Sequence, residues 1–286
     1  MTSVIQQSRR GFALDGYFEA RHLQFYFSKE RKKLALDEVE QKSAQQYLQI
    51  GRVVYFSNSD IEIVRGGGDV RRRFLDFVAA QREPGYRTAL RAYEKALRSR
   101  NLLLKAPSPR WREIEAFEEP LMVAGNQVAR MRGDLLKEMQ TPVNEAHAAI
   151  SGARESLRLE YLPGSGADFA EALKAAREDD SRLRQTSVGP HRDEMGFYLN
   201  DLSSDLASEG QQRTVVLALK LGAAQLLKAH FGTAPLLLLD DIFGELDPAR
   251  RNALLAALPN DSQKVITTTH LDWMTDAPAS AIIRLS

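Results

Sequence analysis

The sequence predicts an α/β fold into which a helical region is inserted. Residues 236–239 are four consecutive leucines, the pattern of a strand buried on both faces of a parallel sheet. The C-terminal third of the chain alternates strand and helix patterns, a rhythm typical of α/β sheets. Residues 70–156 instead have a helical pattern, broken near Pro107 and Pro109 and again at Pro120. Sheet-forming segments are therefore expected on both sides of a helical insertion.

The composition is that of a folded chain without cysteine. The 286 residues contain 39 Lys+Arg, 38 Asp+Glu and no Cys, and 43% of them are hydrophobic, which supports one large domain or a domain with a sizeable insertion. The missing cysteines exclude a disulfide scaffold, a cysteine-ligated zinc site and a thiol nucleophile, and they fit the cytoplasm, where we expect the protein. With a net charge of +1, any DNA-binding surface must be local. We expect no signal peptide and no membrane helix, because no stretch approaches the roughly 20 apolar residues that cross a bilayer.

The N-terminal part of the chain has strand patterns. Residues 16–27 are rich in aromatic side chains with partial alternation, which predicts an antiparallel hairpin. Residues 52–56 form a short apolar run that we interpret as a buried strand. Glycines at 66–68 then mark the change to the helical pattern. We therefore divide the chain into three segments: β-rich 1–75, helical 76–184 and α/β 185–286.

One predicted helix of the inserted region, residues 86–105, carries two stripes. Its apolar stripe predicts packing along a partner helix. That stripe consists of Leu90, Tyr93, Leu97 and Leu104. A basic stripe on an adjacent face consists of Arg87, Arg91, Lys95 and Arg98. The simplest interpretation of the basic stripe is a solvated helix surface, and the alternative is that it binds DNA phosphates together with Arg71.

A strand is also predicted within the inserted region. Residues 157–161 alternate like a strand and end at a Pro-Gly-Ser-Gly turn, residues 163–166. Residues 169–184 then return to a helical pattern, after which the C-terminal sheet pattern begins.

Two carboxylates follow the leucine run directly. Asp240 and Asp241 stand where the strand emerges from the sheet, and ligand sites of open α/β sheets lie at that edge. Neighbouring strand side chains point in opposite directions, so one carboxylate could hold Mg²⁺ while the other orients an attacking water. A strand that merely ends in polar residues, or a helix cap at Asp241, explains the isolated pattern equally well.

A possible phosphate site lies upstream of the two aspartates. Ser208, Gly210 and Gln211 belong to a Ser/Gly turn that opens a predicted helix. The first turn of a helix exposes free N–H groups and the positive end of the helix dipole, and both attract a phosphate.

Two further elements follow the aspartates. Glu245 and Asp247 come just before Pro248, which is placed to start a helix. His270 ends a β-branched strand, the next strand in sequence after the leucine run. An isolated histidine is usually structural, but one at this edge of the sheet can reach a phosphate.

Taken in order, these motifs resemble the C-terminal half of an ABC-type ATPase head. The turn at 208–211 is similar to the signature loop of such heads, and residues 236–241 are similar to their Walker B motif. Residues 245–247 resemble the D-loop that follows Walker B, and His270 resembles the switch histidine.

Additional residues narrow the resemblance to the RecF family. Asp241 stands where most ABC proteins have Glu, and residues 189–193 (Gly-Pro-His-Arg-Asp) and 210–213 also resemble RecF. Residues 72–76 resemble the segment in which RecF passes from its β-rich lobe into its helical arm. The similarity covers nearly the whole chain from about Val53 onward.

The resemblance implies an ATPase head that is split by an inserted helical arm. Such heads form homodimers when ATP is held between the phosphate-binding loop of one head and the signature loop of the other. RecF-like proteins act in DNA replication and recombinational gap repair, bind DNA at single-strand/double-strand junctions, and help RecA loading with RecO and RecR. Their implied activity is that of a weak DNA-dependent ATPase.

The resemblance also implies roles for individual residues. Asp240 would hold Mg²⁺, Asp241 would polarise water, and His270 would contact the γ-phosphate of ATP. The turn at 208–211 would grip the nucleotide that the partner head binds.

One expected motif has no match in the sequence. A phosphate cradle needs the pattern G-x-x-x-x-G-K-[ST] after a strand, and no such run is present. We therefore expect the chain to start after the cradle, and the strand 236–239 to lose a neighbour and expose an unpaired edge. The chain alone should then bind and hydrolyse ATP poorly. A misplaced start, a truncated homologue, or a chain that offers its signature loop to a complete partner would each account for this.

Two alternatives belong to different classes of protein. The head could be vestigial, so that the chain serves as a structural or partner-binding protein without nucleotide. A long coiled-coil ATPase of the same wider group is a poorer fit, because roughly one hundred residues separate the two head segments, which is the size of an ordinary domain insertion.

Overall fold

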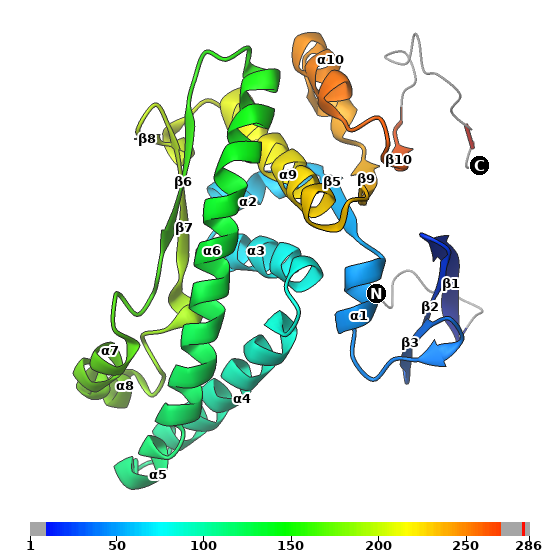
Figure 1. The fold of residues 1–286 in the computed structure, drawn as a ribbon. Coiled ribbons are helices and arrows are strands. Elements are labelled where there is room, and N and C mark those ends of the chain that lie inside the picture. The colour runs from blue at the N-terminus through cyan, green and yellow to red at the C-terminus, as the bar shows by residue number, and fades with distance from the viewer. Residues whose placement is uncertain (1–9, 270–281, 284–286) are drawn as a thin grey trace.

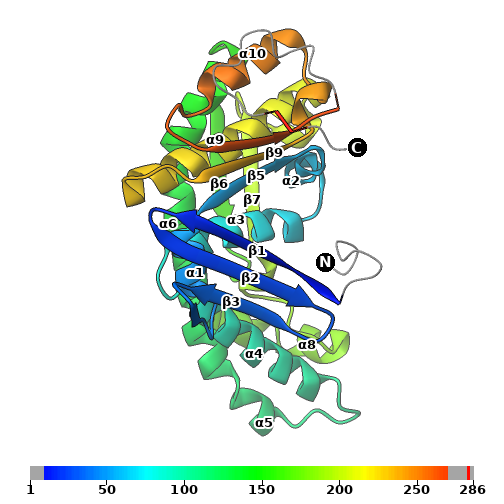
Figure 2. The same cartoon turned by 90° about the vertical axis from the view of Figure 1, so that its right-hand side faces the viewer.

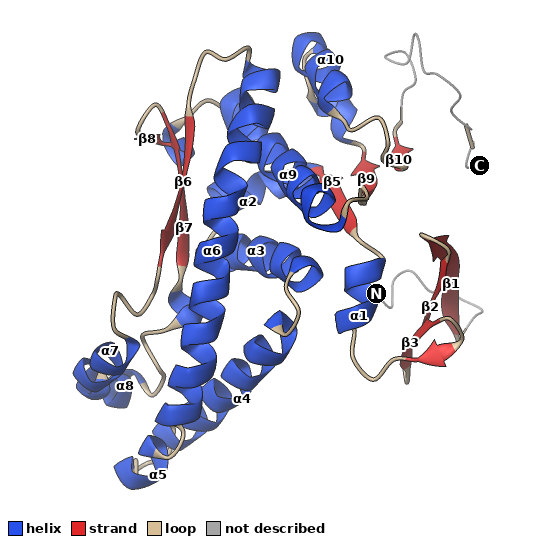
Figure 3. Ribbon diagram, in the orientation of Figure 1, coloured by secondary structure: helices blue, strands red, loops and turns tan. Residues whose placement is uncertain are grey.

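The computed structural model describes residues 10–269 together with 282 and 283. Within them, three separate sheets surround and flank a set of helices, with the longest helix, α6, running through the middle of the molecule (Figures 1 and 3). The strands are β1 (Gly11–Phe18), β2 (Arg21–Ser28), β3 (Lys32–Leu36), β4 (Val39–Glu40), β5 (Val53–Ser57), β6 (Leu157–Leu162), β7 (Glu194–Leu199), β8 (Leu202–Ser203), β9 (Leu236–Asp240) and β10 (Lys264–Thr267). The helices are α1 (Gln45–Ile50), α2 (Glu62–Arg65), α3 (Gly68–Arg82), α4 (Tyr86–Leu104), α5 (Trp111–Glu115), α6 (Glu118–Ser151), α7 (Phe169–Ala175), α8 (Arg177–Leu183), α9 (Glu209–Phe231) and α10 (Pro248–Ala257).

The leucine run forms β9, the central strand of a three-stranded parallel sheet. The strand order is β10-β9-β5, with Leu237 beside Val54 on one side and beside Lys264 on the other. Leu237 and Leu239 are buried whereas Leu236 and Leu238 are half-buried, so one face of the strand is less covered than the prediction of burial on both faces. The expectation that this strand loses a neighbour is wrong, because β5 and β10 pair with both of its edges.

The outer edge of β5 is partly covered by side chains. Three main-chain groups that point away from β9 each pair with a polar side chain. The pairs are Val53 N–H to Gln81 Oε1 at 2.7 Å, Lys220 Nζ to the Tyr55 carbonyl at 2.8 Å, and Ser57 N–H to Asp60 Oδ2 at 2.7 Å. These contacts occupy part of the β5 edge and leave less of it available for pairing with another chain.

The core lies where α9 and α6 cross beneath the parallel sheet (Figure 1). At the crossing, a Cβ on Gly222 would lie 2.9 Å from the Val143 Cα, so the two helices meet backbone to backbone. Pro142 is the neighbouring residue, and α6 continues through it to Ser151. By length and composition α9 could pass for a membrane helix, but 72% of its most apolar window is buried inside the molecule, as in the core helix of a water-soluble fold, so this is weak evidence for a membrane span.

The predicted arm helix is α4, and its apolar stripe packs against α6 as expected. One polar residue is buried in the same region. Arg100 has no exposed side-chain surface and donates to Asp180 at 2.6 Å, to Thr186 at 2.9 Å and to Glu118 at 3.2 Å. This cluster ties α4 to α6, to α8 and to the segment before β7.

Two antiparallel sheets flank the core. The predicted hairpin is β1–β2, which is extended by β3 and β4 and lies beside α1 (Figure 2). The predicted strand at 157–161 is β6, and it pairs with β7 and, through it, with β8. The C-terminal third is therefore not one continuous α/β sheet, since β7 joins the antiparallel sheet with β6 and only β9 and β10 join the parallel one.

The Gly-Pro-His-Arg-Asp segment fastens this antiparallel sheet to the helices. Asp193, with a side chain 1% exposed, accepts a hydrogen bond from Arg132 of α6 at 2.8 Å and one from the Tyr161 hydroxyl.

The Tyr93 hydroxyl lies 2.6 Å from His191 Nδ1, and His191 Nε2 lies 2.9 Å from the Thr186 carbonyl. A carbonyl can only accept, so Nε2 carries the proton and Nδ1 accepts from the tyrosine. Burial lowers the pKa of His191, which favours this neutral form.

Candidate nucleotide and DNA sites

Asp240 lies at the carboxyl end of the central strand, where two hydroxyl groups hold it. The parallel register places Thr267 of β10 directly beside it, and the Thr267 hydroxyl donates to Oδ1 at 2.6 Å. The Tyr55 hydroxyl of β5 donates to Oδ2 at 2.7 Å. These hydrogen bonds, from Thr267 first and Tyr55 second, stabilise the charged form and lower the pKa of Asp240. The result is an ionised, exposed and oriented carboxylate.

Asp241 has a different environment from its neighbour. Its backbone is left-handed, with φ of 51°, a conformation that aspartate tolerates better than most residues. Its N–H donates to the Thr267 carbonyl at 3.1 Å, and its carbonyl accepts from Asn58 Nδ2 at 3.1 Å. Its Oδ1 atom is buried without a hydrogen-bond partner among the described residues. A buried carboxylate oxygen left unpaired is costly, so Asp241 Oδ1 is suited to accept a hydrogen bond from a water or a ligand group.

The two aspartates fit the expected magnesium chemistry in part. Mg²⁺ prefers oxygen ligands and is usually held by one or two carboxylates together with phosphate oxygens and waters. Asp240 accepts one hydrogen bond on each oxygen and is exposed, so lone pairs remain for a cation or its bound water. The described part of the chain has no group of three or more His, Cys, Asp or Glu side chains arranged for a metal. Any ion here would therefore need phosphate or water oxygens as its other ligands.

The predicted phosphate turn opens α9 as expected. Ser208 is exposed and caps the helix, with its side chain accepting from Gln211 N–H at 3.4 Å while Gln211 Oε1 accepts from the Ser208 N–H at 2.8 Å. A Cβ on Gly210 would lie 3.0 Å from the Arg250 guanidinium, so this glycine leaves room for that cation. The exposed start of a 23-residue helix is chemically suited to an anion, although the neighbouring guanidinium already pairs with Asp247.

Glu245 and Asp247 connect the segment after β9 to the start of α9. Glu245 pairs with Arg213 of α9 at 3.2 Å. Asp247 caps α10 by accepting from the Arg250 N–H at 3.0 Å, and the same hydrogen bond together with the Arg250 side chain lowers the pKa of Asp247. Arg250 also donates to Thr214 Oγ1 of α9 at 3.1 Å. The segment after β9 and the first turns of α9 are thus held together through Arg213 and Arg250.

The structure brings some predicted site residues together and leaves one unplaced. Asp240 and Asp241 share one strand end, whereas the turn at Ser208 lies at the start of another element. His270 lies outside the described residues.

Sequence reasoning missed three residues of this site. Tyr55, Asn58 and Thr267 were not predicted, because each reaches the aspartates only through pairing of strands far apart in the sequence. The single available signal was that Tyr55 and Thr267 come at or near the ends of their predicted strands.

The DNA-binding candidates divide into exposed and engaged residues. Arg91, Lys95 and Arg98 are exposed along one side of α4, and Arg98 lies 3.7 Å from Glu94. Arg87 on the same side is half-buried, and burial followed by the neighbouring Arg91 lowers its pKa. Arg71 is engaged inside the molecule, where it pairs with Glu194 of β7 at 2.9 Å and donates to the Gly66 carbonyl at 2.7 Å. The exposed stripe is therefore Arg91, Lys95 and Arg98.

Known proteins similar to this chain carry a consistent name. The DNA replication and repair protein RecF of Thermosynechococcus vestitus is 43% identical over 232 residues, which cover 76% of this chain and 61% of that protein. RecF of Trichodesmium erythraeum is 36% identical over 306 residues, covering 94% of this chain and 73% of that protein. No family model matches the chain. The chain thus spans between about three fifths and three quarters of the length of these relatives.

Solved structures agree with the sequence comparison. The structure of the recombination mediator protein RecF with ATP in the RecFOR pathway superposes with a TM-score of 0.82 at 27% identity, covering 95% of this chain and 78% of that one. A second RecF structure gives the same TM-score at 26% identity. The fold is that of an ABC-type ATPase head with a helical arm, as the motifs predicted. The chain belongs to the RecF family of DNA replication and repair proteins.

Proposed function

We propose that this chain acts in DNA replication and recombinational gap repair. It binds DNA at single-strand/double-strand junctions in an ATP-dependent way and helps RecA loading together with RecO and RecR. Asp240 serves Mg²⁺, Asp241 and His270 serve the reacting end of ATP, and Ser208, Gly210 and Gln211 contact the nucleotide of a partner head in a homodimer. Segments 1–75 and 185–286 form the head in this proposal, and segment 76–184 forms the arm.

The observation that carries this proposal is the pair of aspartates at the end of the central strand. Asp240 is kept ionised and oriented by two hydroxyl donors, and Asp241 holds an unpaired buried oxygen beside it. A helix cap or a polar strand end needs neither feature. Two carboxylates with distinct environments on one strand end are suited to metal-assisted phosphoryl chemistry, in which one serves the metal and the other the attacking water.

Nucleotide binding is tested by titrating labelled ATP and Mg²⁺ against the chain, alone and extended upstream by a segment that carries a glycine-rich cradle. We expect the extended form to bind at least about tenfold more tightly, because the cradle supplies most phosphate contacts. Asp240→Asn in the extended form should remove the Mg²⁺ dependence of binding. Asp261→Asn is the matched control, since Asp261 is an exposed carboxylate paired with Lys228 at the surface.

The same titration separates the two classes of function. Binding that the extension restores and Asp240→Asn weakens supports the proposal. No binding in either form would instead identify a vestigial head that acts through protein partners.

DNA binding is tested on the exposed arm stripe. We expect the double variant Arg91→Glu and Arg98→Glu to weaken binding to a gapped duplex and to reduce the slope of log affinity against log salt by roughly 1.8, about 0.9 per lost phosphate contact. Lys174→Glu with Arg184→Glu is the control, because both residues are exposed cations of the α7–α8 region. An unchanged slope, with circular dichroism showing a folded protein, would rule out this face of α4.

A further inference from the structure

The strand β6 has one edge that is only half satisfied. Asn200 N–H donates to the Ser156 carbonyl, which fixes the alternation of the antiparallel ladder between β6 and β7. Residues 158, 160 and 162 therefore exchange hydrogen bonds with β7, and Leu157, Leu159 and Tyr161 direct their main-chain groups away from it. The outward edge of β6 is made of these three residues.

The first half of this edge is occupied by two side chains of α6. Asn144 Oδ1 accepts from the Leu157 N–H at 3.2 Å. Gln140 bridges the next two groups, with Nε2 donating to the Leu157 carbonyl at 2.8 Å and Oε1 accepting from the Leu159 N–H at 2.8 Å. A side-chain amide presents the same donor and acceptor as a peptide group, so Gln140 takes the place of one residue of an added strand.

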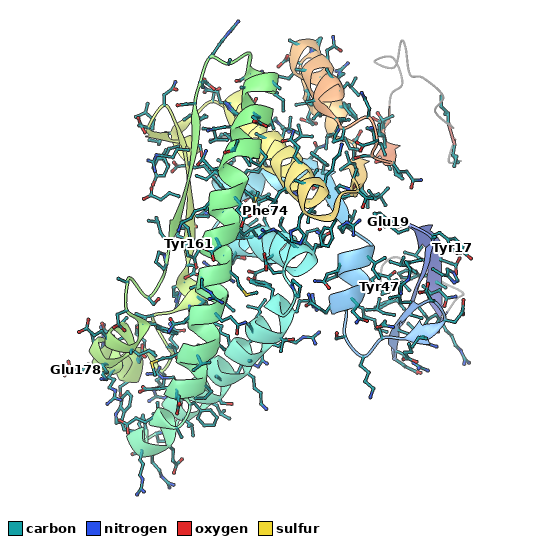
Figure 4. The ribbon with its side chains drawn as sticks, in the orientation of Figure 1. Tyr17, Glu19, Tyr47, Phe74, Tyr161 and Glu178 are labelled. Carbon is teal, nitrogen blue, oxygen red and sulfur yellow. The ribbon has the colours of Figure 1, made fainter. Side chains whose placement is uncertain are left out.

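The second half of the edge has no such substitute. Beyond Gln140, the Leu159 carbonyl and both main-chain groups of Tyr161 have no partner among the residues that the structure describes. These groups border a groove of about 710 Å³ between β6 and the flank of α6, and Figure 4 shows Tyr161 beside that helix. Gly133 forms part of the floor, where a side chain would meet the Tyr161 ring at 3.3 Å. The missing side chain at Gly133 therefore leaves space next to the unpaired main-chain groups of Tyr161.

The groove also has a charge preference. Arg130 and Lys137 line it, are exposed, and have no carboxylate partner in the described chain. Of the two acidic residues in the lining, Glu160 is already paired with Arg158 at 3.0 Å, which leaves only Asp134 uncommitted. Two free cations against one free carboxylate favour an occupant that carries negative charge.

We propose that the β6 edge is a docking site for an extended, acidic segment of a partner protein. The segment adds as a strand beside β6, pairs with the Leu159 carbonyl and the Tyr161 N–H and C=O, and lies over the flank of α6. Main-chain pairing supplies affinity in this mode of recognition, and side chains at alternate positions supply specificity. Carboxylates at those positions meet Arg130 and Lys137. This site is independent of the nucleotide site and of the basic stripe on α4.

The experiment uses two labelled peptides of about nine residues, long enough to cross the groove at roughly 3.3 Å per residue. Both peptides are built mainly of Thr and Val. At the positions meant to face Arg130 and Lys137, one peptide carries Glu and the other carries Lys. We expect the acidic peptide to bind at least about fivefold more tightly than the basic one, because electrostatic complementarity selects between them. When the acidic peptide binds, hydrogen exchange of the Tyr161 amide should slow by about tenfold. Exchange of the Leu159 amide should change little, because that amide already donates to Gln140.

Two further reagents separate strand pairing from charge alone. The acidic peptide is N-methylated at every second residue, in each of the two registers, and one of these forms should lose binding because its donors face β6. The double variant Arg130→Glu and Lys137→Glu should reverse the preference between the peptides. Lys105→Glu with Arg112→Glu, two exposed cations outside the groove, should leave the preference unchanged.

The proposal is overturned by any of three results. The first is failure of the acidic peptide to saturate at about 1 mM, the level of a very weak complex. The second is equal binding of the parent and both methylated forms, which would leave a charge contact only. The third is unchanged Tyr161 exchange in the complex, which would place the peptide elsewhere.

Discussion

The Asp240 carboxylate is oriented by hydroxyl groups from the strands on either side of it. Each hydroxyl donates to a different oxygen, so the carboxylate cannot rotate without breaking a hydrogen bond. Both donors favour the ionised form, and the folded-state pKa of Asp240 is lowered. The associated stability is present above the ordinary carboxyl pKa and is lost as the pH falls through the lowered folded pKa.

We expect Tyr55→Phe to raise the pKa of Asp240 toward its ordinary value without abolishing the shift, because the Thr267 hydroxyl remains. Thr267→Val should raise it further, since Thr267 is the larger cause of the lowered pKa. The measurement is a titration of the labelled aspartate carboxyl carbon by NMR. Thr267→Ser keeps the hydroxyl and serves as the control. An Asp240 pKa that does not respond to Thr267→Val would contradict the hydrogen-bonded arrangement.

At the scale of single residues, the sequence predicts what is contiguous and misses what folding brings together. Asp240 and Asp241 could be identified because the four consecutive leucines before them predict the strand that carries them. Tyr55 and Thr267 could not, because their register against Asp240 depends on two long-range strand pairings. The sequence could not show that Arg71, a DNA-binding candidate, is engaged, because its ion pair with Glu194 joins residues far apart in the chain.

At the scale of elements, α6 and α9 make a close backbone contact where they cross in the core. Gly222 permits it, because any side chain there would meet the Val143 backbone. Since Pro142 precedes Val143, α6 also lacks one main-chain N–H at this crossing. Close backbone approach of this kind leaves the helices little freedom to shift apart.

We predict that Gly222→Ala destabilises the protein by about 1–3 kcal/mol, the usual cost of overpacking a core. The free energy of unfolding is measured by urea denaturation. Gly16→Ala is the matched control, because a Cβ at Gly16 would meet nothing within 4 Å. Equal stability of the two variants would show that α6 and α9 can separate without cost.

The elements themselves were largely predictable, but their neighbours were not. The hairpin, β5, α4, β6 and β9 all occur where periodicity placed them. Strand order failed twice, since β9 has two neighbours where one edge was expected to be open, and β7 pairs with β6 instead of the parallel sheet. Periodicity reports which face of a strand is buried and carries no information about which strand lies beside it.

At the scale of the whole molecule, Arg52 links the β1–β4 sheet to the core. Arg52, 3% exposed, donates to the Gln49 carbonyl at 2.7 Å and to Thr233 Oγ1 at 2.5 Å, and it pairs with Glu19 of the β1–β2 turn. Its guanidinium also lies 4.3 Å from the centre of the Phe231 ring. The assignment of segments 1–75, 76–184 and 185–286 to head and arm stays a prediction.

We expect amides of β1–β3 to exchange with solvent well before those of β9, because β1 is mostly exposed whereas β9 lies in the middle of the core sheet. Hydrogen exchange read by mass spectrometry measures the difference. Arg52→Met should speed exchange in β1–β3 selectively, and Arg31→Met, at an exposed surface ion pair, should not. Equal protection of β1 and β9 would mean that the whole molecule unfolds as one cooperative unit.

The 23-residue helix α9 is about 35 Å long and has an attachment at each stage of its course. Ser208 caps the helix at the surface, Lys220 donates a hydrogen bond to the Tyr55 carbonyl midway along it, and Phe231 at its far end stacks against Arg52. The helix is thus attached to the rest of the molecule at three points. A ligand that binds at its exposed N-terminus and tilts α9 must therefore also displace β5, whose Tyr55 orients Asp240, and Arg52, which holds the β1–β2 hairpin.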